Sequence, residues 1–469
     1  MKKYSLNVFK VLKIGLMFLL ILFMSSCEKW IDPDLNTDPD APADVPMNLL
    51  LPAIQQSMGY NLLGNDCVRT NNIWMQQFDG VERQSFTEAR YQHTPADVNN
   101  LWFSIYTEMM MNTLIFIDKA ENTEGKESPY NAGLGKVLLA TTLGISTDHF
   151  GDMPYSDAFK GTESVLQPLF DTQKDIYASL FSLLNDAITD LSKPDAENMV
   201  DIDGDVIYGN NEGRYLKAAY ALKARHSLQL SKIDGDAAYS AALDAVTNAF
   251  TSIADDMEVP FDKDRKNPIF QFMEQRTDIR MCATLIDMLQ ATDDPRLAFY
   301  ADKDGDGNYT GSEPGSENAS ASYPGSYNAS ADSPVILISY MEMKFIEAEA
   351  NFQLGNTADA LAAFKEGAAA SVLKVTGEAN DDWLDANINT ESEGSLTLER
   401  IMLQKYIALY SQNQPYFDWR RTGFPALDLA DGAKTNEIPR RFPYAQSEID
   451  YNPENVPSVV ITDRVWWDK

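Results

Sequence analysis

The sequence from Asp302 to Glu313 has the spacing of a calcium-binding loop. The pattern D-x-D-x-D-G-x5-E supplies four carboxylates and one backbone carbonyl as possible ligands: Asp302, Asp304, Asp306, Asn308 and Glu313. Calcium suits this set because it is a hard cation that takes about six to eight oxygen ligands. We predict a structural Ca2+ that orders the loop. Because Pro314 and Gly315 follow instead of a clear helix, a solvated acidic turn is the alternative.

Other catalytic or metal-binding patterns are weak. No G-x-S-x-G elbow, H-E-x-x-H motif or P-loop occurs in the sequence. A glycoside hydrolase needs two carboxylates that flank a sugar bond, and among 70 acidic residues such pairs indicate nothing by themselves. The three histidines are scattered, which makes a zinc site improbable. In an oxidising envelope Cys67 and Cys282 could form a disulfide, and two buried thiols are an equal alternative.

The N-terminus predicts export and a lipid anchor. Four lysines precede an apolar run at 14–24, which is shorter than the roughly 18 apolar residues that a membrane span needs. The run ends in "FMSSC", which resembles a lipobox, so residues 1–27 are expected to be a lipoprotein signal peptide with Cys27 as the lipid attachment site. An ordinary signal peptide is the alternative. The acidic, proline-rich stretch 28–48 is expected to be a tether.

The charge of the chain excludes some partners. The net charge is -32, so the surface repels nucleic acid and anionic lipid. Acidic surfaces also serve solubility alone, and the charge therefore names no partner.

The rest of the chain, 49–469, is expected to be a single, mainly α-helical domain of paired helices. Apolar residues at 102, 106, 110, 114 and 117 share one helical face, which makes Trp102 and Tyr106 core residues. A second helix is expected to begin after Asp171 or Thr172. The helices on either side of "LGNT", with Gly355 at the end of the first, resemble one tetratricopeptide hairpin. Long irregular insertions are expected at about 253–334 and about 414–469.

Six motifs in order resemble the SusD/RagB family of outer-membrane nutrient-binding lipoproteins, and within it the SusD-like branch. They are "LNTDPDAP", "STDHFGDMPYSDAF", "FDTQKDIYASL", "DVIYGNNEGRYLKAAYALKAR", "DDPRLAFY" and "FDWRRTGFPAL". The resemblance covers nearly the whole mature chain. The chain departs from the family pattern at 208–211, where "YGGD" is common, and at 411–414, where "EGxR" is common.

The resemblance implies a fold, a location and a role. The fold is a mainly helical, tetratricopeptide-like scaffold with long loops on one side. The location is the outer face of the outer membrane, through the lipid anchor. The role is non-catalytic: the protein binds glycans and delivers them to a SusC-type TonB-dependent transporter, which it covers as a lid. Peptide binding in the same uptake system, a surface glycoside hydrolase and a helical protein-binding adaptor are the alternatives.

No shared set of sugar-contacting residues can be carried over from the family, so the ligand site is predicted from residue type. Sugar rings stack on aromatic faces, and polar neighbours meet the hydroxyl groups. Trp74 and Gln76 stand among polar residues, which favours partial exposure. The full candidate set is Trp74, Gln76, Tyr323, Tyr327 and Trp383. Aromatic residues also build cores, and packing is the alternative for each.

Overall fold

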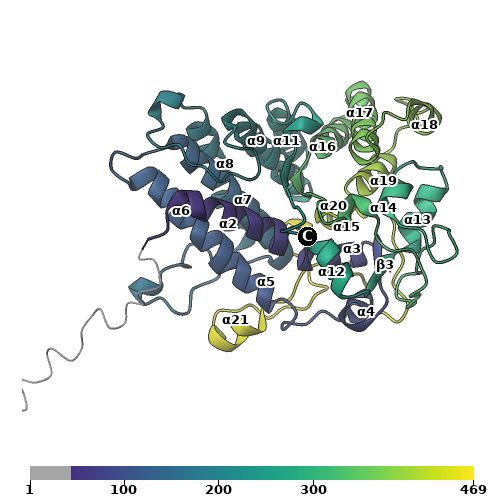
Figure 1. The fold of residues 1–469 in the computed structure, drawn as a ribbon, viewed down its shortest axis with the longest axis horizontal. Coiled ribbons are helices and arrows are strands. Elements are labelled where there is room, and N and C mark those ends of the chain that lie inside the picture. Colours follow the sequence, from purple (N-terminus) through teal and green to yellow (C-terminus); the bar gives the residue numbers. More distant parts are fainter. Residues whose placement is uncertain (1–43) are drawn as a thin grey trace, which may run out of the picture. The chain divides into compact units, whose positions relative to one another are not determined.

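The structure, a computed structural model, describes residues 44–469, and Met47–Lys469 forms one compact unit. The predicted signal peptide, Cys27 and most of the tether lie outside the described residues. The unit is mainly helical, as predicted (Figure 1). Its first half contains α2 (Met47–Ser57), α3 (Asp66–Trp74), α4 (Arg83–Ala89), α5 (Asn99–Phe103), α6 (Met111–Asn122), α7 (Pro129–Phe150), α8 (Gln173–Leu191), α9 (Glu212–Gln229), α10 (Ser231–Asp234) and α11 (Asp236–Val246).

The second half contains the remaining helices and three of the four strands that the described residues form. Its helices are α12 (Pro268–Gln275), α13 (Ala283–Gln290), α14 (Leu297–Tyr300), α15 (Ser326–Ala329), α16 (Tyr340–Gln353), α17 (Thr357–Thr376), α18 (Asp381–Asn387), α19 (Leu398–Ala408), α20 (Gln414–Thr422) and α21 (Gln446–Tyr451). β1 (Phe78–Gly80) pairs antiparallel with β3 (Ile279–Met281), and β2 (Met257–Val259) with β4 (Val335–Ile338). The expected insertion at 253–334 therefore contains several short elements.

Helix α7 is at the centre of the first half. All its residues except Pro129 and Lys136 are buried, because α6, α8 and α9 pack around it. Ser128 caps its start by accepting a hydrogen bond from the Asn131 N–H. Gly144 allows α9 to come close: a Cβ there would lie 2.4 Å from Cε1 of His226.

Within residues 44–469, we find no helix with the length and hydrophobicity that a membrane span requires.

The predicted helical pairs are present. Helix α8 buries one apolar stripe, Ile176, Leu180, Leu184, Ala187 and Leu191. Its cap is Thr172, whose hydroxyl accepts from the Asp175 N–H. Helices α16 and α17 form the expected hairpin through Gly355, whose φ of 81° ends α16. The predicted helix through Trp102 is interrupted by the π-helix η3 (Ser104–Met110). Trp102 is buried as expected.

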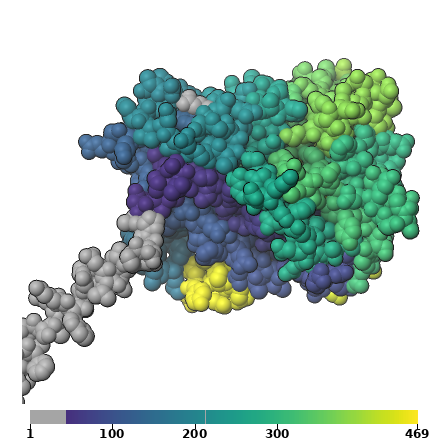
Figure 2. All heavy atoms as spheres, viewed as in Figure 1, coloured from purple at the N-terminus to yellow at the C-terminus, as the bar shows by residue number. Residues whose placement is uncertain are grey.

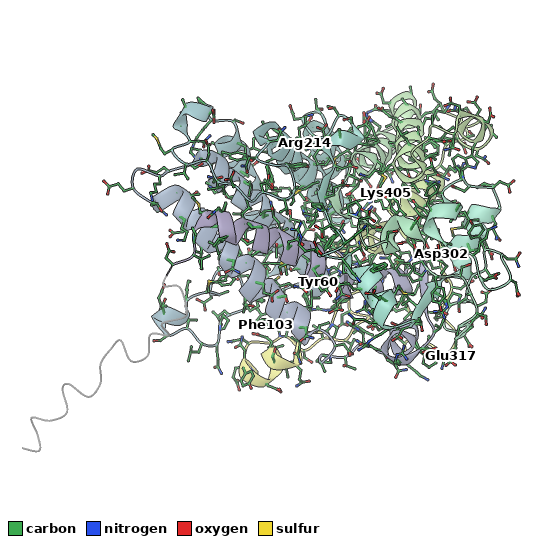
Figure 3. The ribbon with its side chains drawn as sticks, viewed as in Figure 1. Tyr60, Phe103, Arg214, Asp302, Glu317 and Lys405 are labelled. Carbon is green, nitrogen blue, oxygen red and sulfur yellow. The ribbon has the colours of Figure 1, made fainter. Side chains whose placement is uncertain are left out.

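A buried cluster of four charges ties α16, α19 and α20 together. Arg421 donates to both carboxylate oxygens of Glu349 and to Asp418, and Lys405 lies 2.8 Å from the second Asp418 oxygen. All four side chains are at most 4% exposed. The cluster holds two cations and two anions, so its net charge is zero. Figure 3 labels Lys405 beneath α16 and α17.

The C-terminal segment packs back onto α7. Trp467, on η7 (Trp466–Asp468), is completely buried, and its indole N–H donates to Asp148 at 2.7 Å. Cys67 and Cys282 are both buried and free, so the disulfide alternative is not formed.

Candidate functional site

Four segments that are far apart in the sequence form one face of the molecule, which we name the loop face. Its segments are 76–91, 278–284, 301–325 and 428–434. β1 and β3 form its floor, with Asp79 opposite Arg280. Segment 301–325 extends this sheet, since the Met281 N–H donates to Ser322 and the Ser312 N–H donates to Met281. Figure 2 shows the blue atoms around α4 against the teal and green atoms of the second half.

The fourth segment closes the loop face through backbone and side-chain hydrogen bonds. The Asp431 N–H donates to the Pro314 carbonyl, and the Lys434 N–H donates to the Arg90 carbonyl. Gln76 donates to the Asp428 carbonyl at 2.5 Å. These contacts make one rigid surface from loops that the sequence places up to about 350 positions apart.

A buried carboxylate holds the loop face from below. Asp79 is 1% exposed and accepts from the Ser312 hydroxyl at 2.5 Å and from the Gly315 N–H at 2.8 Å. Burial raises the pKa of Asp79 to about 6, and these hydrogen bonds oppose the rise. Asp79 is therefore an internal clip, and it is inaccessible to a ligand.

Tyr323 is the exposed aromatic residue of this face. Its side chain is 37% exposed, and the Arg280 guanidinium lies 3.9 Å from the ring centroid. Arg280 also donates to the tyrosine hydroxyl at 3.0 Å and to the Ala319 carbonyl at 2.9 Å. The ring is thus fixed in orientation by a buried arginine while part of it stays open to solvent.

Charged side chains stand at the edge of the same face. Arg83 is half-exposed and pairs with the buried Asp278 and with Glu82. Its φ of 48° is unusual for a residue other than glycine. Glu317, half-exposed, lies 3.7 Å from Arg90. Figure 3 labels Glu317 and Asp302 on the same side as α4 and α13. The face therefore offers hydrogen-bond donors and acceptors around one aromatic ring.

Two of the predicted ligand residues belong to the interior. Trp74 is 0% exposed, and its ring packs edge-on against Tyr416 and Phe442. Gln76 is 3% exposed. Its side-chain amide donates to the Asp428 carbonyl and accepts from the Thr284 hydroxyl. The expected partial exposure of both residues was wrong, because segments that follow much later in the chain cover them.

The other two predicted residues are partly buried in different places. Tyr327 lines an internal cavity of about 30 Å³, which has room for water and not for a sugar ring. Trp383, on α18, donates its indole N–H to the Thr292 carbonyl at 2.8 Å. Two of the predicted ligand residues, Tyr323 and Gln76, therefore lie in segments of the loop face. Tyr323 is exposed, whereas Gln76 is buried. We did not predict Arg280, Arg83 or Glu82 as candidate ligand residues from the sequence, since no local motif marks them.

The predicted calcium ligands do not come together. Asp304 accepts from the N–H groups of Asp306 and Asn308, each at 2.9 Å, and from Thr310. The hydrogen bond from the Asn308 N–H is the main reason that the pKa of Asp304 is lowered. Within residues 44–469, no group of three or more His, Cys, Asp or Glu side chains is placed to hold a metal ion.

Calcium binding by this loop stays a prediction. We expect titration of Ca2+ into chelator-treated protein to give a dissociation constant of about 10⁻⁴–10⁻³ M, as in weak extracellular sites. Asp302→Asn should weaken it, and Asp203→Asn, which changes an exposed aspartate outside this loop, should not. Absence of binding at millimolar Ca2+ would contradict the prediction.

The chain resembles one family over most of its length. Residues 39–445 match the model of the SusD-like_2 family, described as "Starch-binding associating with outer membrane". A SusD/RagB family protein from Bacteroides thetaiotaomicron is 25% identical, with a TM-score of 0.76 over 91% of this chain and 99% of that one. No curated protein sequence matches this chain.

Two further solved structures share the fold. One, a chitin-binding protein, is 24% identical, with a TM-score of 0.77 over 90% of this chain and 100% of that one. The other, a chitin-binding SusD homologue from Flavobacterium johnsoniae, is 21% identical, with a TM-score of 0.74 over 90% of this chain and 97% of that one.

Proposed function

The chain belongs to the SusD-like family, which is described as starch-binding and associating with the outer membrane, and we propose that it captures glycans on the loop face. The observation that carries the proposal is the exposed ring of Tyr323, which Arg280 fixes in orientation, on the same face as the Arg83–Glu82 ion pair. A sugar ring places its C–H groups on an aromatic face, and its hydroxyls both donate and accept hydrogen bonds. The chitin-binding relatives support glycans as the ligand class.

Binding without catalysis fits three carboxylates of this face, those of Asp79, Glu82 and Asp278. A glycosidase needs one carboxyl group as acid and a second as base or nucleophile, both free to meet the substrate. Here Asp278 is buried and paired with Arg83, Glu82 also pairs with Arg83, and Asp79 is held by Ser312 and Gly315. Each of these carboxylates thus has a structural partner, which supports a role in binding alone.

The proposed place of action is the outer side of the outer membrane. Cys27 would carry the lipid, and the stretch 28–48 would connect it to the folded unit. The partner would be a SusC-type TonB-dependent transporter that receives the glycan. The family description supports the membrane association, and the "FMSSC" sequence supports the anchor.

Native affinity gels that contain starch, glycol chitin, xylan or mannan test the proposal. We expect retardation in at least one gel, without new reducing ends in the same mixture. Tyr323→Ala should weaken it about tenfold, equivalent to about 1.4 kcal/mol, because the stacking surface is lost. Tyr451→Ala is the matched control, since Tyr451 is 78% exposed and lies outside the loop face.

Three results would contradict the proposal in different ways. New reducing ends would indicate a hydrolase. If Tyr323→Ala and Tyr451→Ala reduce the retardation equally, the glycan site lies outside the loop face. Absence of retardation in every gel would exclude these glycans and turn the search to peptides.

A further inference from the structure

A second cavity, of about 520 Å³, lies between the C-terminal end of α7 and the C-terminal segment of the chain. Its size falls within the range of about 300–1,000 Å³ that is usual for small-molecule sites. The polar and aromatic side chains that form its walls include Asp152, Arg441, Tyr444, Asp463, Arg464 and Trp466. None of its lining residues belongs to the loop face, so the two surfaces are separate.

The cavity contains a buried guanidinium with a spare donor. Arg441 is 5% exposed, donates from Nε to the Phe442 carbonyl at 3.2 Å and from Nη2 to the Phe150 carbonyl. Among the described residues, no carbonyl or carboxylate accepts a hydrogen bond from its Nη1, and the neighbouring side chain that interacts with the guanidinium is Tyr444. Gly151 lies beside this nitrogen: a Cβ on Gly151 would be 3.4 Å from Nη1. A polar ligand in the cavity can therefore accept from a charged group whose position is already fixed.

Two carboxylates also line the cavity. The half-buried Asp152 accepts from the Gln173 N–H at 2.7 Å through Oδ1, and the exposed Asp463 accepts from the Val460 N–H at 2.8 Å through Oδ2. Each carboxylate is thus held by the backbone through one oxygen while the residue lines the cavity. Arg464 is 44% exposed and is held by Asp468, and Lys469 lies at the rim.

One wall of the cavity is aromatic. Trp466 is half-buried, and its ring centroid is 5.9 Å from that of Tyr177. The neighbouring Trp467 is completely buried and hydrogen-bonded to Asp148, which fixes the short helix that carries Trp466. Tyr444 adds a second ring, which lies 4.8 Å from the Arg441 guanidinium.

The mixture of charges narrows the class of ligand. An anion would face Asp152 and Asp463, and a cation would face Arg441, Arg464 and Lys469. A purely apolar ligand would remove solvent from the polar atoms of these groups that have no protein partner, which is costly. A neutral, hydroxylated ring meets all of them, because each hydroxyl donates and accepts, and its C–H face can lie on Trp466.

We propose that this cavity is a second saccharide-binding site, which holds a neutral sugar ring between Trp466 and the side chains of Arg441, Asp152 and Asp463. The chain would then bind one glycan through two separate surfaces, or two glycan segments at once. Two linked sites raise the effective affinity for a long polymer far above that of either site for a short one. The second site is independent of the loop face, and it can be correct even if the first is not.

Native mass spectrometry with three neutral tetrasaccharides, those of N-acetylglucosamine, maltose type and cellulose type, tests the second site. With the binding sugar, the wild-type chain should carry up to two molecules. Trp466→Ala should lower the maximum to one, and Tyr323→Ala should also lower it to one. Arg464→Ala changes an exposed side chain. It should weaken the binding of the same sugar molecule that is lost in Trp466→Ala. Tyr451→Ala should keep both, and thermal unfolding of each variant controls for misfolding.

The outcomes separate the two sites. One bound sugar that is lost in Trp466→Ala and Arg464→Ala and kept in Tyr323→Ala supports the cavity and contradicts the loop face. One bound sugar that is lost in Tyr323→Ala and kept in Trp466→Ala overturns the second site. Failure of all three tetrasaccharides to bind also overturns it, whatever the affinity gels show for polymers.

Discussion

Arg421→Met is expected to lower the free energy of unfolding by about 3–5 kcal/mol. Arg421 is 2% exposed on its side chain, and it neutralises Glu349 and Asp418 together with Lys405. Without it, the cluster holds two carboxylates and one cation, and Glu349 keeps no cation within the cluster. An uncompensated charge in the interior is what makes the loss of one partner so destabilising. Equilibrium unfolding in urea measures the change.

An exposed pair provides the matched control for this prediction. Arg265 lies 2.8 Å from Asp262, and both side chains are about half-exposed. Arg265→Met should therefore cost roughly 0–1 kcal/mol. The double variant Arg421→Met with Glu349→Met should be more stable than Arg421→Met alone, because it removes the unpaired carboxylate. Equal effects of Arg421→Met and Arg265→Met would show that the cluster adds nothing to stability.

Trp74→Ala is the second change with a large expected effect, again of about 3–5 kcal/mol. Trp74 has no exposed surface, and its ring contacts His93, Tyr416 and Phe442. These rings cannot easily move to fill the cavity that the loss of the indole would leave. Trp74→Phe should cost less, since it keeps an aromatic ring but leaves the Glu88 carbonyl without the indole N–H. Denaturant unfolding of both variants measures the two costs.

The half-buried Trp383 is the control for Trp74, because it offers the same residue type at the surface. Trp383→Ala should destabilise the chain clearly less than Trp74→Ala. Glycan retardation by the folded Trp74→Phe protein should equal that of the wild type, since Trp74 is remote from solvent. Loss of retardation with unchanged stability would instead place Trp74 in a binding site.

The sequence by itself determined the helical class and several boundaries. The stripe of α8, its cap at Thr172 and the turn at Gly355 depend on residues within a few positions of one another, so local chemistry is sufficient to predict them. The six ordered motifs likewise indicated the family that the comparison then established. Helix α7 gave no amphipathic signal, because neighbours bury it on every side.

Only the tertiary structure decided which polar or aromatic residues reach the surface. Trp74 and Tyr323 both stand among polar neighbours in the sequence, yet Tyr416 and Phe442 cover Trp74, whereas Tyr323 stays open on Arg280. The loop face and the second cavity, which Trp466 lines, each combine segments that are hundreds of positions apart in the sequence. Burial depends on these distant contacts, and periodicity and motif spacing report only on near neighbours in the chain.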